Sequence, residues 1–255
     1  MHPVLLKFWD FTFYSYGLMV ALGFFFGAIY LSISAKKIKP PIISQDDIFN
    51  IIFGVLISAI VGARLLFVIA EFPDMFSRPL EIFKVWEGGL VYYGGFIGSI
   101  IFAFAYLKIK KLNIYKVLDL FAPAVALGHF FGRIGCLLAG CCYGKPTNQP
   151  WGIVFEDPQS LAVLGVHLHP TQIYEAGVNL ILFVILYFYN KKAHKPGMAI
   201  AIYLIFYPIC RFIIEFFRGD FRGGYSFGLS VSQIISIIVF IIGITIFYRA
   251  SKCKK

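Results

Sequence analysis

Long apolar runs alternate with short polar segments along the whole chain. A helix needs about 20 residues to cross the hydrocarbon core of a bilayer, and most of the runs are close to that length. Each run is continuous, whereas the strands of a membrane β-barrel alternate apolar and polar residues over about ten positions. The pattern therefore predicts seven membrane-spanning helices, over residues 14–33, 48–70, 90–107, 117–138, 174–189, 198–217 and 229–248.

The composition supports a membrane protein. Apolar residues make up 59% of the 255 residues and charged residues 14%, against about 45–50% and about 25% in a soluble domain. A cytosolic enzyme, a disordered protein and a disulfide scaffold are all disfavoured. We therefore expect an all-α integral membrane protein, a single polytopic domain over residues 1–255. Residues 1–13 lack the small-residue cleavage site of a signal peptide, so the first span is predicted to be retained.

The net charge of +10 raises the question of a nucleic-acid partner, and the positions of the basic residues answer it. Fourteen basic residues lie in segments on one side of the predicted spans: Lys36, Lys37, Lys39, Lys108, Lys110, Lys111, Lys116, Lys191, Lys192, Lys195, Arg249, Lys252, Lys254 and Lys255. Six lie on the other side: Lys7, Arg78, Lys84, Lys145, Arg218 and Arg222. The positive-inside rule then predicts an N-terminus outside and a C-terminus in the cytoplasm. We expect the lysines to contact anionic lipid headgroups, with no nucleic-acid partner.

The segment at about residues 140–171 is a long connection on the predicted outer side. It contains Pro146, Pro150, Pro158 and Pro170. A connection of this length in a compact protein is usually functional, so we expect an outward loop or lid.

Three arginines fall inside predicted spans, where charged side chains are costly and by default functional. Arg211 and Glu215 are four residues apart on one helix face, so Glu215 orients Arg211 or merely neutralises it within the bundle. Arg64 and Arg133 have no acidic residue within a helical turn. A guanidinium near the outer face matches a lipid phosphate, which it grips with paired N–H groups. Snorkelling to the interface is the alternative.

Further polar and small residues gather near the same predicted level. Gly94 and Gly95 follow Tyr93, and such small residues allow close helix packing or leave room for a ligand. Gln172 and Glu175 open the fifth span at the outward interface.

Cys136, Cys141 and Cys142 cluster at the outward end of the fourth predicted span. Their Cys-x4-Cys-Cys spacing is not a standard zinc pattern, so no metal site is predicted. The remaining interpretations are small packing residues, a Cys136–Cys141 disulfide and a role in thiol chemistry.

Six motifs occur in order: GARLLFVI, GGLVYYGGFIG, GRIGCLLAGCCYG, LHPTQIYE, YPICRFIIEFFRGD and LSVSQ. On these motifs the chain resembles the prolipoprotein diacylglyceryl transferases over nearly its whole length. The resemblance implies an enzyme that moves the diacylglyceryl group of phosphatidylglycerol onto the lipobox cysteine thiol of a prolipoprotein, leaving a thioether and releasing glycerol 1-phosphate. It also implies no metal or organic cofactor, and a multi-pass location in the bacterial cytoplasmic (inner) membrane with the active site toward the outer face.

The resemblance also suggests roles for individual residues. Arg133 and Arg211 are the expected headgroup and phosphate contacts, and Arg64 is a weaker third. The predicted catalytic residues are Arg133, Arg211, Tyr93 and Glu215. The predicted substrate-binding residues are Arg64, Gly94, Gly95, Gly144, Tyr207, Gln172 and Glu175.

Three positions depart from the family pattern. Tyr93 stands where the family commonly has a histidine proposed as a base, and Cys136 and Cys141 replace a common asparagine and acid. A tyrosine is a poor base at neutral pH. Tyr93 therefore hydrogen-bonds the headgroup, or Glu175 or His169 acts as the base, or an arginine lowers the pKa of the acceptor thiol.

These departures keep other functions open. The first is a family paralogue with the same lipid donor and a different acceptor. The second is a non-enzymatic lipid-binding or transport protein, and the third is a thiol-redox enzyme that uses the cysteine cluster.

Overall fold

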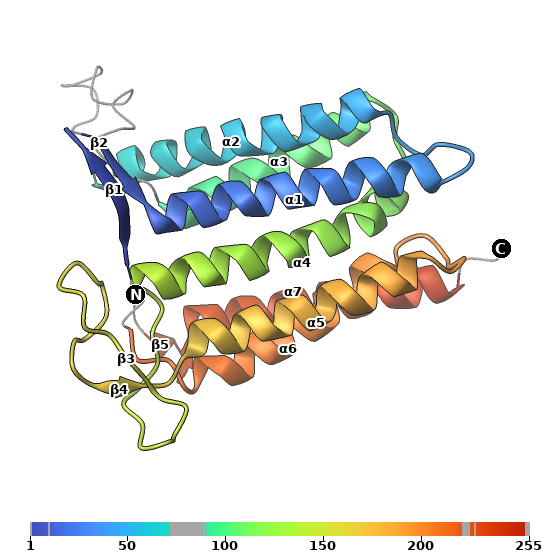
Figure 1. Cartoon of the computed structure of the whole chain (residues 1–255). Helices are drawn as coiled ribbons and strands as arrows, with labels where there is room; N and C mark the ends of the chain where they lie inside the picture. The colour runs from blue at the N-terminus through green and yellow to red at the C-terminus, as the bar shows by residue number, and fades with distance from the viewer. Residues whose placement is uncertain are drawn as a thin grey trace. The chain divides into compact units, whose positions relative to one another are not determined.

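The computed structural model describes residues 2–9, 11–71, 89, 91–220, 225, 226 and 228–252. Within them, seven helices are long and apolar enough to span a membrane (Figure 1). They are α1 (Ser15–Lys37), α2 (Gln45–Glu71), α3 (Tyr92–Ile109), α4 (Ile114–Ala139), α5 (Thr171–Asn190), α6 (Met198–Glu215) and α7 (Val231–Lys252). Each overlaps one predicted run, which confirms the seven-helix membrane fold.

The outward faces of these helices are apolar. Phe53 and Ile57 of α2 are each 60% exposed, and Ile181 of α5 is 61% exposed. Exposed apolar surface on this scale would cause a protein to aggregate in water. In a bilayer the same side chains contact lipid tails, so the chain is a multi-pass membrane protein.

The chain divides into two compact units, residues 1–31 with 118–255, and residues 32–117. The sequence-based expectation of a single domain stays a prediction.

In the unit of residues 32–117, α2 and α3 approach closely at glycines. A Cβ atom on Gly94 would lie 2.2 Å from the carbonyl oxygen of Gly62, and one on Gly98 would lie 2.5 Å from that of Ser58. A Cβ on Gly95 would lie 2.9 Å from the carbonyl oxygen of Ala59. The space beside these glycines is therefore filled by the backbone of α2, as in small-residue packing between membrane helices.

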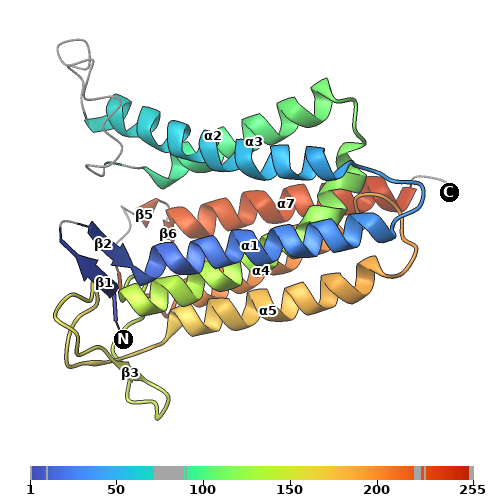
Figure 2. The same cartoon turned by 45° about the horizontal axis from the view of Figure 1, so that its top comes forward.

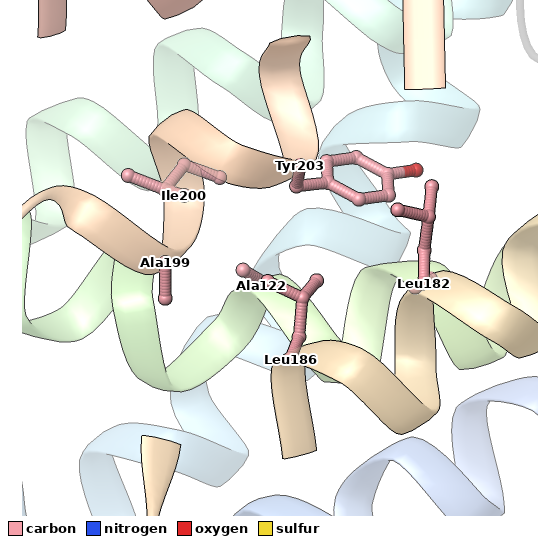
Figure 3. Packing of buried hydrophobic residues seen from close by; sticks show 7 residues of the cluster. Ala122, Leu182, Leu186, Ala199, Ile200 and Tyr203 are labelled. Carbon is pink, nitrogen blue, oxygen red and sulfur yellow. The ribbon is translucent and has the colours of Figure 1, made fainter. Parts of the chain in front are cut away.

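In the other unit, α4, α5 and α6 share an apolar core. Figure 3 shows Ala122 of α4 between Leu182 and Leu186 of α5 and the side chains of Ala199 and Tyr203 of α6. Four of these residues are at most 4% exposed. This packing fixes the three helices that carry the polar residues described below.

A buried carboxylate from α4 caps the first turn of α6. Asp119 is 4% exposed, and its two carboxylate oxygens accept the N–H groups of Gly197 and Ile200 at 2.6 and 2.9 Å. The first N–H groups of a helix have no partner within the helix. Asp119 therefore satisfies two of them across a helix–helix contact.

Three short antiparallel sheets lie at one end of this unit, which we call the strand end (Figures 1 and 2). They pair β1 (Val4–Phe8) with β2 (Phe11–Tyr14), β3 (Ile153–Val154) with β4 (His167–Leu168), and β5 (Tyr225–Ser226) with β6 (Leu229–Ser230). None of these strands is predicted by the hydrophobic pattern. β3 to β6 have two residues each and β2 has four, too few for an alternation to register, and β1 (VLLKF) shows no regular alternation.

The long connection between α4 and α5 is folded. It covers residues 140–170, close to the predicted 140–171, and carries its own small core. Phe155 and Leu168 are 2% and 1% exposed, and Ala162 packs with them. The connection is therefore anchored by side chains of its own, as in a compact surface loop.

The glycine packing of α2 and α3 is testable with Gly94→Ala. The added methyl group would overlap the Gly62 carbonyl, and overpacking of this kind costs about 1–3 kcal/mol. We expect a lower unfolding temperature in detergent micelles. The control is Gly177→Ala, because nothing lies within 4 Å of a Cβ at Gly177; it should melt at or above the wild-type temperature, since alanine favours helix. Equal melting of the Gly94 variant and wild type would contradict the close approach.

The cap on α6 is testable with Asp119→Ala. This variant leaves two buried N–H groups without an acceptor, at a cost of about 1–3 kcal/mol each. We expect a fall in unfolding temperature, and a smaller fall for Asp119→Asn, which keeps one oxygen acceptor. Asp46→Ala removes an exposed carboxylate and should melt like the wild type.

Candidate functional site

The strand end of α4, α5 and α6 brings together a set of charged side chains, which we call the arginine–carboxylate network. Arg133 lies near the end of α4 and Glu175 lies in the second turn of α5. Arg211 and Glu215 lie in the last two turns of α6. The members of the network are Arg133, Glu175, Arg211, Glu215, Arg218 and Asp220.

Glu175 is the centre of the network. Its side chain is 2% exposed and contacts three guanidinium groups. One carboxylate oxygen lies 2.6 Å from Nε of Arg133. The other lies 3.5 Å from Nη1 of Arg211 and 3.6 Å from Nη1 of Arg218. Arg133 has no acidic residue within a helical turn on α4. It is nevertheless paired, because its partner Glu175 comes from α5.

Glu215 forms a second bridge within the network. It lies 2.5 Å from Nη1 of Arg211 and 3.7 Å from Nε of Arg218. Glu215 also accepts a hydrogen bond from the hydroxyl of Ser230 at 2.8 Å. The four-residue spacing that predicted the Arg211–Glu215 contact is thus borne out by the geometry.

The LSVSQ motif supplies a polar support for α6 from the start of α7. The Ser230 N–H donates to the side chain of Gln233 at 2.9 Å, and the Gln233 N–H donates to the Ser230 hydroxyl at 3.2 Å. This reciprocal pair is a capping box. Ser232 of α7 accepts a hydrogen bond from Arg211 at 3.0 Å, so β6 and α7 together contact both members of the Arg211–Glu215 pair.

Arg218 and Asp220 belong to the network but are absent from the predicted site residues. Arg218 is 6% exposed and donates from Nε and Nη2 to the Asp220 carboxylate at 3.0 and 2.7 Å. From the sequence, Arg218 is predicted to be one of the outward loop charges. The feature of the sequence that could have placed Arg218 in the site is its spacing. Arg218 follows Glu215 by three residues, so it lies on the same helix face as Glu215.

The three arginines differ in exposure. The Arg133 side chain is 19% exposed, against 8% for Arg211 and 3% for Arg218. Arg133 is therefore the network cation that an anion from outside the protein reaches most readily, because the other two are less exposed. A guanidinium carries five N–H donors, so an ion pair through Nε leaves its fork able to bind phosphate oxygens.

Gly144 joins the long connection to the end of α6 through backbone contacts. Its N–H donates to the His169 carbonyl at 3.0 Å, and the Gly219 N–H donates to the Tyr143 carbonyl at 3.1 Å. A Cβ on Gly144 would lie 2.4 Å from the His169 carbonyl oxygen, and one on Gly219 would lie 2.6 Å from that of Gly144. Gly144 thus permits the close backbone approach predicted for it, and this approach holds Arg218 in place.

An aromatic cluster lies on the same helices. The Tyr203 hydroxyl lies 2.7 Å from Nδ1 of His129. Tyr207 stacks on Tyr203 with ring centroids 5.4 Å apart and lies 5.3 Å from the His129 ring. His129 is thus a hydrogen-bonded histidine within the bundle.

His169 and Gln172 lie where the long connection meets α5. Nδ1 of His169 lies 3.2 Å from the Tyr174 hydroxyl, which also accepts the Trp151 indole N–H at 2.8 Å. The Gln172 amide donates to the Cys141 carbonyl at 2.8 Å, and the Thr171 hydroxyl donates to the Cys142 carbonyl at 2.7 Å. These bonds fix the Cys141–Cys142 backbone against the start of α5.

The three cysteines at this end lie together. Sγ of Cys142 is 3.8 Å from Sγ of Cys136 and 3.8 Å from Sγ of Cys141, and all three sulfur atoms lie within 4.8 Å of one another. Contacts with the Cys136 and Cys142 sulfurs, together with burial, raise the pKa of the Cys141 thiol.

Four predicted site residues lie in the unit of residues 32–117. Arg64 is 7% exposed, donates to the Gly89 carbonyl at 3.2 Å and lies over the Phe67 ring. Tyr93 is 42% exposed on the first turn of α3. Gly94 and Gly95 lie against α2, as described above, which supports the helix-packing interpretation of this pair.

A model of the prolipoprotein diacylglyceryl transferase family matches residues 3–249 of the chain. The match includes every residue of the arginine–carboxylate network and all seven helices except the last turn of α7.

Individual relatives agree with the family match. A phosphatidylglycerol–prolipoprotein diacylglyceryl transferase of Clostridium tetani is 43% identical over 220 residues, which are 86% of this chain and 86% of the relative. A phosphatidylglycerol–prolipoprotein diacylglyceryl transferase 2 of Clostridium perfringens is 38% identical over 221 residues, 86% of this chain and 84% of the relative. The transferase of Bordetella parapertussis is 34% identical over 221 residues, 85% and 82% of the two chains. With a family match over nearly its whole length and relatives this similar, the chain belongs to the prolipoprotein diacylglyceryl transferase family.

Proposed function

We propose that this chain transfers the diacylglyceryl group from phosphatidylglycerol to the lipobox cysteine thiol of prolipoproteins. The acceptor sulfur, as a thiolate, forms a bond to the glycerol carbon of the diacylglyceryl group. The bond from that carbon to the phosphate oxygen breaks, and glycerol 1-phosphate leaves with the electron pair. The observation that carries the proposal is the convergence of three arginines on the buried carboxylate of Glu175, in a member of this transferase family.

The network suits the leaving group of this reaction. Negative charge on the phosphate increases as the carbon–oxygen bond breaks, and fixed N–H donors stabilise such charge without reorganising. Arg133, the most exposed of the three guanidinium groups, contacts the phosphate. Arg211, which contacts both Glu175 and Glu215 and is less exposed, is the second cation.

The carboxylates position the arginines. Glu175 contacts guanidinium groups from α4, α6 and the segment after α6. With its two oxygens engaged in this way, we assign Glu175 a positioning role and not that of the base that deprotonates the thiol. Such supporting contacts hold catalytic side chains within the small tolerance that charge stabilisation requires.

The orientation of the chain fits lipid substrates of the outer leaflet. Within the unit that holds the network, the strand end carries Lys7 and Lys145. The opposite end carries Lys191, Lys192 and Lys195 in the α5–α6 connection, and Arg249 and Lys252 in the last turn of α7. By the positive-inside rule the strand end then faces outward from the bacterial cytoplasmic (inner) membrane. The network would meet phosphatidylglycerol and the lipobox segment at that face.

The direct test uses purified protein in micelles that contain phosphatidylglycerol and a peptide with a lipobox cysteine. We expect a thioether-linked diacylglyceryl peptide and one glycerol phosphate per product, both measured by mass spectrometry. A well-folded sample that releases glycerol phosphate only with a different acceptor would favour the paralogue. A sample that binds the lipid without turnover would favour a lipid-binding protein.

In the same assay, Arg133→Ala and Arg211→Ala should each lower kcat at least about 100-fold, the size of effect seen when one charge-stabilising donor is removed. The matched control is Lys145→Ala, which removes an exposed cation at the same end of the molecule and should keep wild-type kcat. Near-normal turnover of either arginine variant would show that the phosphate lies elsewhere.

We expect Arg218 to act as a positioning residue that holds the carboxylates of the network in place. Arg218→Lys keeps the charge but loses the planar fork that pairs with Asp220 and reaches Glu175 and Glu215. We expect kcat to fall about tenfold while the KM for phosphatidylglycerol changes little, together with a lower unfolding temperature. Wild-type kcat in a variant that melts normally would remove Arg218 from the network's function.

A further inference from the structure

We propose that Cys136, Cys141 and Cys142 form a three-thiolate site for one thiophilic metal ion, of the class that includes Zn²⁺ and Cu⁺. The proposal rests on the geometry of the three thiols and is independent of the proposed transferase activity. It differs from the expectation drawn from the Cys-x4-Cys-Cys spacing, because the folded backbone brings the sulfur atoms closer than the spacing alone suggests.

The distances between the sulfur atoms suit a shared ion. Two of the three separations are 3.8 Å, and all three sulfurs lie within 4.8 Å of one another. With a metal–sulfur bond of about 2.3 Å, sulfur atoms lie about 3.8 Å apart around a tetrahedral ion and about 4.0 Å apart around a trigonal one. The three thiols could therefore ligate one ion with sub-ångström movements of the side chains.

The backbone that brings the thiols together adopts unusual conformations. Helix α4 ends at Ala139, and Gly140 follows with a φ of +76°, as is common after a helix C-terminus. Cys142 has a φ of +62°, which is rare for a residue other than glycine and costs energy. A strained backbone at a residue whose side chain joins a cluster often marks a functional site.

The surroundings hold this arrangement in place. The carbonyl groups of Cys141 and Cys142 accept hydrogen bonds from Gln172 and Thr171, whose side chains are buried at the start of α5. Cys136 and Cys142 are 8% and 5% exposed, whereas Cys141 is partly exposed. The site is thus preorganised, and Cys141 provides the side from which an ion enters.

The ligand type determines which ions fit. Thiolate sulfur selects Zn²⁺ and Cu⁺ over Mg²⁺ and Ca²⁺, which prefer oxygen. On binding, each thiol gives its proton to solvent and its sulfur forms one bond to the ion, so three protons are released and no electrons are transferred. Cu⁺ accepts three thiolates as a complete set, whereas Zn²⁺ would take a water molecule as its fourth ligand.

Binding should stabilise the junction of α4, the long connection and α5. An ion that binds the folded chain and not the unfolded one raises the unfolding temperature in proportion to the logarithm of its concentration. Arg133 lies one helical turn before Cys136, and Glu175 lies one turn after Gln172 and Thr171. The ion would therefore fix the two helix ends that carry the Arg133–Glu175 pair.

The test uses the full-length protein in micelles, reduced and then freed of reductant under argon, with the thiols counted before titration. One arm adds Cd²⁺ as a probe for Zn²⁺ and records thiolate-to-metal charge-transfer absorption. The other arm adds Cu⁺ in competition with a coloured Cu⁺ chelator. We expect one ion per chain in at least one arm, and a higher unfolding temperature in the loaded protein; the arm that responds identifies the ion class.

Single-cysteine variants make the test specific. Cys136→Ser, Cys141→Ser and Cys142→Ser should each weaken binding at least tenfold, with apo unfolding temperatures measured to confirm folding. Cys210→Ser is the control, because that thiol lies on α6 outside the cluster, and it should bind like wild type. Fully reduced protein that binds neither ion at one equivalent, or a triple serine variant that binds as wild type does, would overturn the proposal. Failure here is distinguishable from failure of the proposed function, because metal binding and product formation are measured in separate assays.

Discussion

A carboxylate buried among guanidinium groups governs the described site. Glu175 is 2% exposed in a membrane protein, where an isolated charge is costly and a paired one is tolerated. Glu175 is tolerated in the interior because it contacts the positive charges of Arg133, Arg211 and Arg218. The same contacts compensate the charges of the arginines. The ends of α4, α5 and α6 are therefore tied to one another by electrostatics as well as by the apolar core between the helices.

The rest of the strand end serves to hold that network. The capping box at Ser230 and Gln233 starts α7 and places the Ser230 hydroxyl on Glu215. The contact between Gly144 and Gly219 joins the long connection to the chain just after Arg218, with backbone groups too close for a side chain at either position. The two glycines allow a close backbone approach beside Arg218, and the Ser230 hydroxyl donates a hydrogen bond to Glu215.

The family match and the geometry account for different aspects of the molecule. The match with the family over residues 3–249 indicates the reaction class. The geometry indicates how the charges are divided: one arginine is partly exposed, two are buried, and all three contact the carboxylate of Glu175. The cysteine cluster lies beside this network and is held by the first residues of the same helix that carries Glu175.

Much of the fold followed from the sequence, because a bilayer imposes a fixed length of apolar helix on any chain that crosses it. The seven runs, the long connection near residues 140–171 and the Arg211–Glu215 pair were all evident from residue type and spacing. The ends of helices were less well predicted. α1 continues to Lys37 and α2 begins at Gln45, since polar residues at the membrane boundary extend a helix without adding to its apolar run.

The sequence by itself determined that this is a membrane protein with seven long apolar runs, and that Arg64, Arg133, Arg211 and Glu215 lie inside them. Apart from the Arg211–Glu215 pair, only the tertiary structure decided the partners of these charges. Arg133 lacks an acid on its own helix and finds Glu175 on α5, and Arg218 changes from a loop charge into a member of the network. The same holds for the cysteines, which a turn at Gly140 brings within 4.8 Å of one another. Spacing along one helix reveals contacts only on that helix, whereas these contacts join side chains from elements that meet only when the chain folds.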